Sequence, residues 1–185
     1  MKLLETLLAL GQLDHLPRAG WIQAGVPEPE SIAGHVLGVC HLALATAGQV
    51  EPRLDLRRVL TLVLVHDAPE ALSGDLPQQA SRALPEGAKQ TMEEVLAGRL
   101  LHAFPADVQT AWTEWCAQET REARFVKLCD RVQLGVRCLQ LTRSGQVNLD
   151  DFWDGLRKED PSEFPPLVVL LQEILAQAPE KPPTV

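Results

Sequence analysis

The sequence contains no cluster of basic residues. Its 17 lysines and arginines are outnumbered by 25 aspartates and glutamates, which gives a formal net charge of −8 at pH 7. Binding a nucleic acid requires clustered Lys and Arg side chains that neutralise phosphates, so we expect no nucleic-acid partner. A small anionic ligand remains compatible with this charge if a metal ion or an individual arginine meets the ligand's charge locally.

Paired cysteines and long apolar runs are also missing. None of the four cysteines lies in a CxxC motif, and three lie inside apolar helical patterns, which indicates reduced, buried thiols. No run reaches the ~20 apolar residues that cross a bilayer. The N-terminal segment MKLLETLLALGQL has no small-residue cleavage site after its apolar stretch. We therefore expect a cytoplasmic protein without a membrane partner.

Apolar residues recur at helical spacing along almost the whole chain, and Pro/Gly clusters separate the periodic segments. This pattern predicts an all-α fold, and the length of 185 residues suits one domain. The domain is expected over residues 1–178, followed by a disordered tail at 179–185. The predicted helices cover about residues 2–14, 31–47, 55–67, 86–103, 106–117, 119–143 and 166–177. Residues 17–30, with two glycines and three prolines, are predicted to form a loop.

One of these helices also has an alternative interpretation. The apolar run that follows Asp55, LRRVLTLVLVHD, could be a buried strand, but its length and its place among helices favour a helix. The residue before a proline disfavours the α conformation, so Ala68 before Pro69 should end this helix at about Asp67.

Four polar residues interrupt apolar helical faces. His35 lies between Ile32 and Val36, His66 and Asp67 end the run VLTLVLV, and Asp130 lies within RFVKLCDRVQLGV. A buried carboxylate is normally paired or metal-bound, although a single interior histidine is more often a hydrogen-bonded structural residue. Taken together, two imidazoles and two carboxylates suit Co²⁺, Mn²⁺ or a similar divalent ion better than a thiolate-bound structural zinc. An octahedral ion with four such ligands would keep two positions for water and a substrate oxygen.

The pattern H…HD…D formed by His35, His66, Asp67 and Asp130 resembles the HD superfamily of metal-dependent phosphohydrolases. Within it, the flanking segments are similar to the 5′-deoxynucleotidase group. These segments are LPRAGW (16–21), PESIAGH (29–35), LVHDAPEALSGDLP (64–77) and EARFVKLCDR (122–131), and the motif-bearing core spans about residues 15–140. A bare HD dipeptide is weak evidence, whereas the full set of motifs in this order is specific. The resemblance implies a helical HD-domain bundle, one bound divalent ion and a homodimer.

The resemblance also implies roles for residues near the four ligands. Glu70 would act in general acid/base catalysis or orient the attacking water, and Asp75 would bind the nucleotide near the ribose 3′-hydroxyl. Arg18 is the candidate for the phosphate, because a guanidinium matches phosphate oxygens with a planar fork. Trp21 is a candidate wall that excludes a 2′-hydroxyl, and an indole packed on the core is nearly as good an interpretation. The other three residues also have alternative interpretations. Arg18 could be a surface arginine, Glu70 a helix-capping residue and Asp75 a turn residue.

The chain also departs from the family pattern. Gly34 stands where an acidic residue often precedes the first histidine, and Arg131 and Gln133 replace a common Lys and Glu after Asp130. Lys127 is close enough along its predicted helix to pair with Asp130 or reach a phosphate. Between the HD pair and the last aspartate the only further histidine is His102, which favours one metal ion over two.

The sequence therefore predicts a metal-dependent phosphohydrolase that hydrolyses 2′-deoxyribonucleoside 5′-monophosphates. Two alternatives stay open. The enzyme could act on another small phosphomonoester, or the chain could be a metal-stabilised nucleotide-binding protein without turnover. The residues that would read the sugar are only Trp21 and Asp75, so the sequence separates these alternatives poorly.

Overall fold

The computed structural model describes residues 1–180, and every regular element within this range is a helix. This confirms the predicted all-α fold. The α-helices are α1 (Leu3–Leu10), α2 (Ala19–Gln23), α3 (Ile32–Thr46), α4 (Leu56–Val65), α5 (Glu70–Ser73), α6 (Gln78–Ala83), α7 (Ala88–Leu101), α8 (Ala106–Ala117), α9 (Arg121–Arg143), α10 (Asp150–Leu156) and α11 (Pro165–Leu175). Short 3₁₀ helices cover Gly11–Asp14 and Ala47–Gln49. Of the tail predicted at 179–185, residues 181–185 lie outside the described part.

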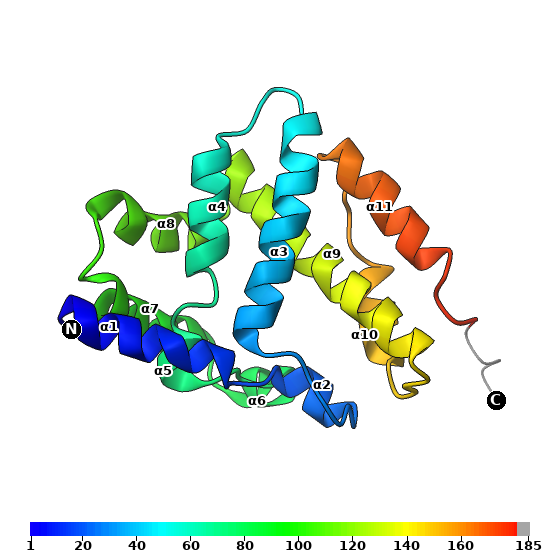
Figure 1. Ribbon diagram of the computed structural model, residues 1–185, viewed down its shortest axis with the longest axis horizontal. Helices are drawn as coiled ribbons and strands as arrows, with labels where there is room; N and C mark the ends of the chain where they lie inside the picture. Colours follow the sequence, from blue (N-terminus) through cyan, green and yellow to red (C-terminus); the bar gives the residue numbers. More distant parts are fainter. Residues whose placement is uncertain (181–185) are drawn as a thin grey trace.

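Helix α9 is the central element of the bundle. It runs behind α3 and α4 in Figure 1 and packs against both of them, and α10 and α11 cover its C-terminal half. Its fully buried residues include Phe125 and Val132. At Gly135 a Cβ atom would lie 3.2 Å from Leu156 Cδ2, so the glycine lets α10 approach closely. The large core cluster extends from Trp21 to Ile174.

Helix α4 begins where the sequence predicted and ends slightly earlier. The Asp55 side chain accepts a hydrogen bond from the Arg58 amide at 3.1 Å, which is an N-cap. Leu62 and Val63 are fully buried, so the apolar run is a core helix and not a strand. The helix ends at Val65, and the chain continues through tight turns to Pro69. His66 and Asp67 therefore lie at the buried C-terminal end of α4.

Four short helices were not predicted. Helix α2 lies within the segment predicted as a loop, and that part of the prediction is wrong. Helices α5, α6 and α10 were also missed. Each has four to seven residues, which is too short for an apolar period to be recognised. Helix α10 contributes to the site, because the Phe152 ring stacks on Trp21 with ring centroids 4.3 Å apart.

The apolar helices α3 and α11 both pack against the core of the bundle. In the described part of the chain, one segment, Ile32–Gln49, has the length and apolar composition of a membrane span, with a mean hydropathy of 1.2 over 18 residues. It contains α3, whose inner face packs on α4 and α9. Helix α11 buries Leu167, Leu171 and Ile174 against α9, so this face closes the core and is not free for an interface.

We predict that Asp55→Ala destabilises the protein by about 1 kcal/mol, because the substitution removes the N-cap of α4. Asp55→Asn retains a side-chain oxygen that can accept the same hydrogen bond and should stay close to the wild-type stability. Urea denaturation of both variants measures the difference. Equal stabilities of Asp55→Ala and the wild type would contradict the capping role.

Candidate metal centre

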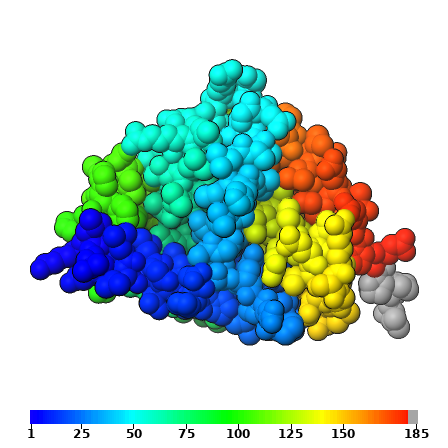
Figure 2. All heavy atoms as spheres, viewed as in Figure 1, coloured from blue at the N-terminus to red at the C-terminus, as the bar shows by residue number. Residues whose placement is uncertain are grey.

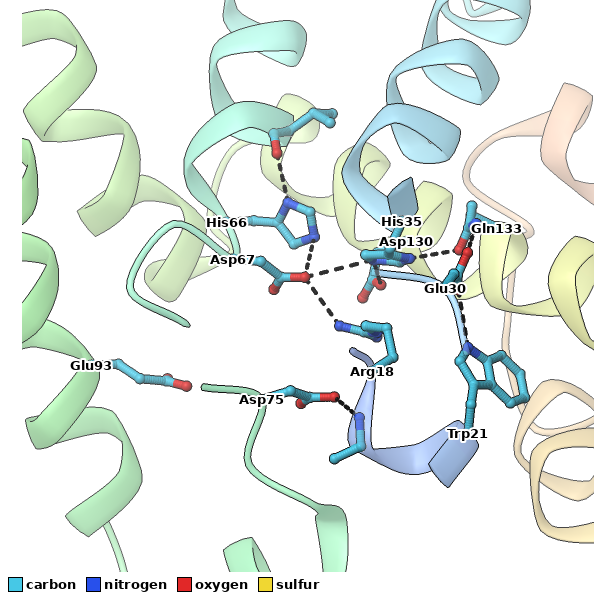
Figure 3. Close-up of polar contacts among 12 residues, drawn as sticks. Arg18, Trp21, Glu30, His35, His66, Asp67, Asp75, Glu93, Asp130 and Gln133 are labelled. Carbon is cyan, nitrogen blue, oxygen red and sulfur yellow. Dashed lines mark hydrogen bonds and ion pairs between the residues drawn. The ribbon is translucent and has the colours of Figure 1, made fainter. Parts of the chain in front are cut away.

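Three helices bring the predicted ligands together at one end of the bundle. His35 comes from the first turn of α3, which begins after Ser31 because the Ser31 side chain accepts a hydrogen bond from the Gly34 amide. His66 follows α4, and Asp130 lies in the middle of α9 (Figure 3). One ligand atom from each of His35, His66 and Asp130 lies within 4.8 Å of the other two. Residues far apart in the sequence therefore form a compact set of nitrogen and oxygen atoms.

The two imidazoles present a lone pair to this set. His66 Nδ1 lies 2.6 Å from the carbonyl oxygen of Val63, which can only accept, so Nδ1 carries the proton. Neither His35 Nε2 nor His66 Nε2, both buried, has a hydrogen-bond partner of acceptable geometry. Yet His35 Nε2 is 3.1 Å from Asp130 Oδ1, and His66 Nε2 is 3.2 Å from Asp67 Oδ2. Unprotonated nitrogens and carboxylate oxygens repel at such distances unless a cation lies between them, so the donor set fits a divalent metal ion.

Asp67 lies beside this set and also contacts Arg18. Its Oδ2 atom is 3.7 Å from His35 Nε2 and accepts a hydrogen bond from Arg18 Nη1 at 3.1 Å. Asp67 is not among the three residues whose ligand atoms are all mutually close. Arg18 is held here by backbone hydrogen bonds between its segment and the start of α3, from the Arg18 amide to Glu30 O and from the Ile32 amide to Leu16 O.

The buried carboxylates of the cluster are charged. Burial alone would raise the pKa of Asp67, but the adjacent His66 and then Arg18 hold that pKa well below its usual range. Burial acts in the same direction on Asp130, and the adjacent His35 lowers its pKa strongly. Burial lowers the pKa of His66, but Asp67 outweighs burial and raises it overall.

The pKa of Glu70 is shifted in the opposite direction from the pKa values of Asp67 and Asp130. Its side chain is buried, its Oε2 atom has no hydrogen-bond partner, and burial together with the charges of Asp67 and Asp75 raises its pKa to about 9. A carboxyl group with this pKa carries a proton at neutral pH. Glu70 therefore has the protonation state of a general acid close to the cluster.

A cavity of about 640 Å³ lies next to the cluster. Arg18 and Asp75 belong to its wall, and the Asp75 carboxylate accepts a hydrogen bond from the Ala19 amide at 2.6 Å. Further wall residues come from α6, α7, α9 and α10, among them Arg82, Lys89, Arg131 and Phe152. The volume lies within the range of ~300–1,000 Å³ that is usual for small-molecule sites.

Trp21 lines this cavity with very little of its surface. Only 1% of the residue is exposed, and the indole stacks on Phe152 and donates a hydrogen bond from Nε1 to Glu30 Oε1 at 3.0 Å. This environment fits the interpretation of an indole packed on the core more closely than that of a wall touching a ligand.

The remaining candidates are not part of the ligand set. Lys127 Nζ lies 3.8 Å from Asp130 Oδ2, so it pairs with a carboxylate of the cluster. His102 is the residue that follows α7, and His15 and His41 are exposed. Among the described residues, one group of potential ligands is compact enough for a metal.

The sequence did not predict a direct role for Gln133 or Glu30. Gln133 Oε1 lies 2.6 Å from His35 Nδ1, and Gln133 Nε2 donates to Glu30 Oε2 at 3.4 Å (Figure 3). Gln133 stands where the family commonly has Glu, and the structure places its side chain in contact with a predicted ligand. Glu30 lies in the PESIAGH segment, and only its motif membership could have indicated a role.

Comparisons with known proteins agree with this geometry. A family model of the HD domain matches residues 10–158. The 5′-deoxynucleotidase HDDC2 of Bos taurus is 30% identical over 181 residues, which cover 95% of this chain and 85% of that protein. The Xenopus laevis protein of the same name is 32% identical over 142 residues, which cover 75% and 68%. The crystal structure of the PH0347 protein from Pyrococcus horikoshii OT3 superposes with a TM-score of 0.84 at 28% identity and covers 95% of this chain and all of that one.

The chain therefore belongs to the HD-domain family, and within it to the 5′-deoxynucleotidase-like group. The family match spans the segments that carry all four candidate ligands.

We predict that Glu70→Gln stabilises the metal-free protein, and that the gain grows as the pH rises. The pKa of Glu70 is raised from 4.5 to about 9, so the wild type loses stability over this pH interval as the unfolded chain gives up a proton that the folded protein retains. Glutamine has no proton to lose. The expected gain rises by at most about 1.4 kcal/mol for each pH unit between pH 5 and pH 8.

Thermal denaturation in chelator between pH 5 and pH 8 measures this difference. The matched control is Glu86→Gln, which changes an exposed glutamate. A stability difference between Glu70→Gln and the wild type that does not change with pH would show that Glu70 is not protonated in the folded protein.

Proposed function

We propose that this chain is a metal-dependent 5′-deoxynucleotidase that hydrolyses 2′-deoxyribonucleoside 5′-monophosphates to deoxynucleosides and phosphate. The observation that carries the proposal is the cluster of two imidazole nitrogens and a carboxylate oxygen beside a cavity whose wall contains Arg18 and Asp75. The relatives named 5′-deoxynucleotidase support the substrate class. The proposal treats residues 1–178 as one domain, because the core extends from Trp21 to Ile174.

The proposed metal ligands are His35, His66, Asp67 and Asp130, and the ion is Co²⁺, Mn²⁺ or a similar divalent cation. When bound, such an ion supplies Lewis acidity toward a phosphoryl oxygen and lowers the pKa of water. Asp67 serves two partners in this scheme, because its Oδ2 atom also accepts the hydrogen bond from Arg18.

Three other residues bind the substrate and move protons. Arg18, which is partly buried among carboxylates, offers its remaining N–H groups to the phosphate and offsets charge that develops on its oxygens. Glu70 exchanges a proton with the water or the leaving oxygen. A carboxylate has about four lone-pair sites, so Asp75 can accept a hydrogen bond from a sugar hydroxyl as well as from the Ala19 amide. Trp21 acts on the sugar through the shape of the cavity wall.

A phosphate-release panel tests the proposed function. We expect Co²⁺- or Mn²⁺-loaded protein to release phosphate from 2′-deoxyribonucleoside 5′-monophosphates faster than from the ribonucleotides. We expect Glu70→Ala to retain the metal and to lower turnover roughly 10²- to 10⁴-fold, because the proton-transfer group is lost. Glu86→Ala, at an exposed position, should turn over like the wild type.

Other outcomes of the panel favour the alternatives. Release from other small phosphomonoesters alone would indicate a different phosphohydrolase. Nucleotide binding without turnover would indicate a binding protein. Either result contradicts the proposed deoxynucleotidase activity.

We also propose that the protein forms a homodimer. Helix α1 buries the polar Thr6, whose hydroxyl donates to Leu100 O, and leaves four leucines between 52% and 68% exposed. These are Leu3, Leu4, Leu7 and Leu8. Figure 2 shows α1 on the surface of the molecule. Light scattering should give twice the chain mass for the wild type and the single mass for Leu4→Glu/Leu8→Glu, and a monomeric wild type would refute the dimer.

The chemistry of the thiols supports a cytoplasmic location. All four cysteines are free, and burial raises the pKa of Cys129 and Cys138, which keeps these thiols protonated. Fractionation of native cells followed by detection of the protein tests this location.

A further inference from the structure

A row of hydrogen bonds connects His35 to helix α2. Starting from the candidate metal centre, His35 Nδ1 is 2.6 Å from Gln133 Oε1, Gln133 Nε2 is 3.4 Å from Glu30 Oε2, and Glu30 Oε1 is 3.0 Å from Trp21 Nε1. Figure 3 shows these four side chains joined one to the next by dashed lines. They come from α3, α9, the segment before α3, and α2. His35, Trp21 and Gln133 are buried.

The hydrogen bonds of this row can run in only one direction, because of the donor and acceptor properties of Trp21 and Glu30. The indole N–H of Trp21 can only donate, and the Glu30 carboxylate can only accept. Gln133 must therefore turn its NH₂ group to Glu30 and its carbonyl oxygen to His35. An acceptor at this place requires the proton of the imidazole to be on Nδ1, which leaves the lone pair on Nε2. The tautomer of His35 is thus determined by a carboxylate that His35 does not touch.

The Glu30 side chain lies beside an arginine. Arg137 Nε lies 4.0 Å from Glu30 Oε2 and is buried without a hydrogen bond of its own. The residue in contact with His35 is the neutral amide of Gln133. A carboxylate at that position would hold the same tautomer, because it also accepts a hydrogen bond from Nδ1–H.

Gly38 makes room for the amide. It lies one turn after His35 on α3, and a Cβ atom there would be 2.7 Å from Gln133 Nε2 and 3.0 Å from Gln133 Cγ. Cβ atoms essentially never come within 3.0 Å of another heavy atom in this way, so any side chain at position 38 displaces Gln133. The absence of a side chain at this position is a requirement of the hydrogen bond to His35.

We propose that Gln133, Glu30 and Trp21 are positioning residues that hold His35 in the tautomer able to bind a metal, with Gly38 providing the space. This inference rests on the proposed metal centre and adds residues that act on a ligand without touching the ion. Hydrogen-bond partners of ligating histidines typically change metal affinity 10- to 100-fold when they are replaced.

The first test uses Glu30→Gln, which keeps the shape of the side chain. The new amide can point its own NH₂ group at Gln133, so Gln133 can turn over and offer a donor to His35. In the metal-free variant, two-bond ¹H–¹⁵N NMR correlations should show a proton on Nε2 of His35, whereas the wild type should show it on Nδ1. The affinity for Co²⁺, measured by calorimetry, should fall roughly 10- to 100-fold. Glu28→Gln removes the same charge at an exposed position two residues away and should match the wild type.

The second test uses Gly38→Ala against Gly98→Ala. Both glycines lie in helices, but a Cβ atom at Gly98 meets nothing within 4 Å. Gly38→Ala should lose the Nδ1–H signal of His35 and a similar part of the Co²⁺ affinity. Gly98→Ala should retain both and unfold at a slightly higher temperature than the wild type, because alanine has a higher helix propensity than glycine.

The two readouts separate this inference from the proposed function. A wild type that binds no Co²⁺ would refute the metal centre, and with it the inference. A wild type that binds Co²⁺ without phosphatase activity would refute only the enzyme. The positioning role is refuted if folded Glu30→Gln keeps the proton on Nδ1 and binds Co²⁺ like the wild type. The same two readouts decide the case in Glu30→Gln if Gly38→Ala does not fold.

Discussion

The candidate metal centre depends on one arrangement: two imidazole nitrogens without a proton are buried next to carboxylate oxygens. His35 Nε2 and His66 Nε2 have no hydrogen-bond partner, and Asp130 and Asp67 lie within 3.2 Å of them. Leaving such polar atoms unpaired in a protein interior costs about 1–3 kcal/mol for each group. A divalent cation removes this cost for all of them at once. The place where α3, α4 and α9 come together is therefore suited to a cation. The large core of the bundle holds these polar groups in place even without the cation.

The protonation state of each carboxyl group near this centre follows from its burial and from its neighbours. Asp67 accepts a hydrogen bond from Arg18, Asp130 lies 3.8 Å from Lys127 Nζ, and both stay ionised. Glu70 is buried without such a partner and keeps a proton with a pKa of about 9. Neighbouring carboxylic acids thus have opposite protonation states at neutral pH because their surroundings differ. Sites that transfer protons commonly show such a division between an ionised and a neutral acid.

Much of this organisation could be predicted from the sequence, for reasons that are local. The apolar period of α4 and α9 identified two core helices, and polar residues that interrupt such a period, such as His66 and Asp130, are conspicuous. Helices of four to seven residues, such as α2 and α10, leave too short a pattern to be recognised. The contact of Gln133 with His35 joins residues that are far apart in the chain, and its direction depends on Glu30. Only the folded structure shows which of many polar side chains lies against a given imidazole.

The close approach at Gly38 also constrains how this protein can change over time. A methyl group at position 38 and a long side chain at position 133 cannot occupy the same space, so neither position can drift independently of the other. An alanine at 38 requires Gln133 to leave its present place, and another group would then have to fix His35. Related chains should therefore fall into two sets, those with glycine at 38 and a long polar residue at 133, and those in which both have been exchanged.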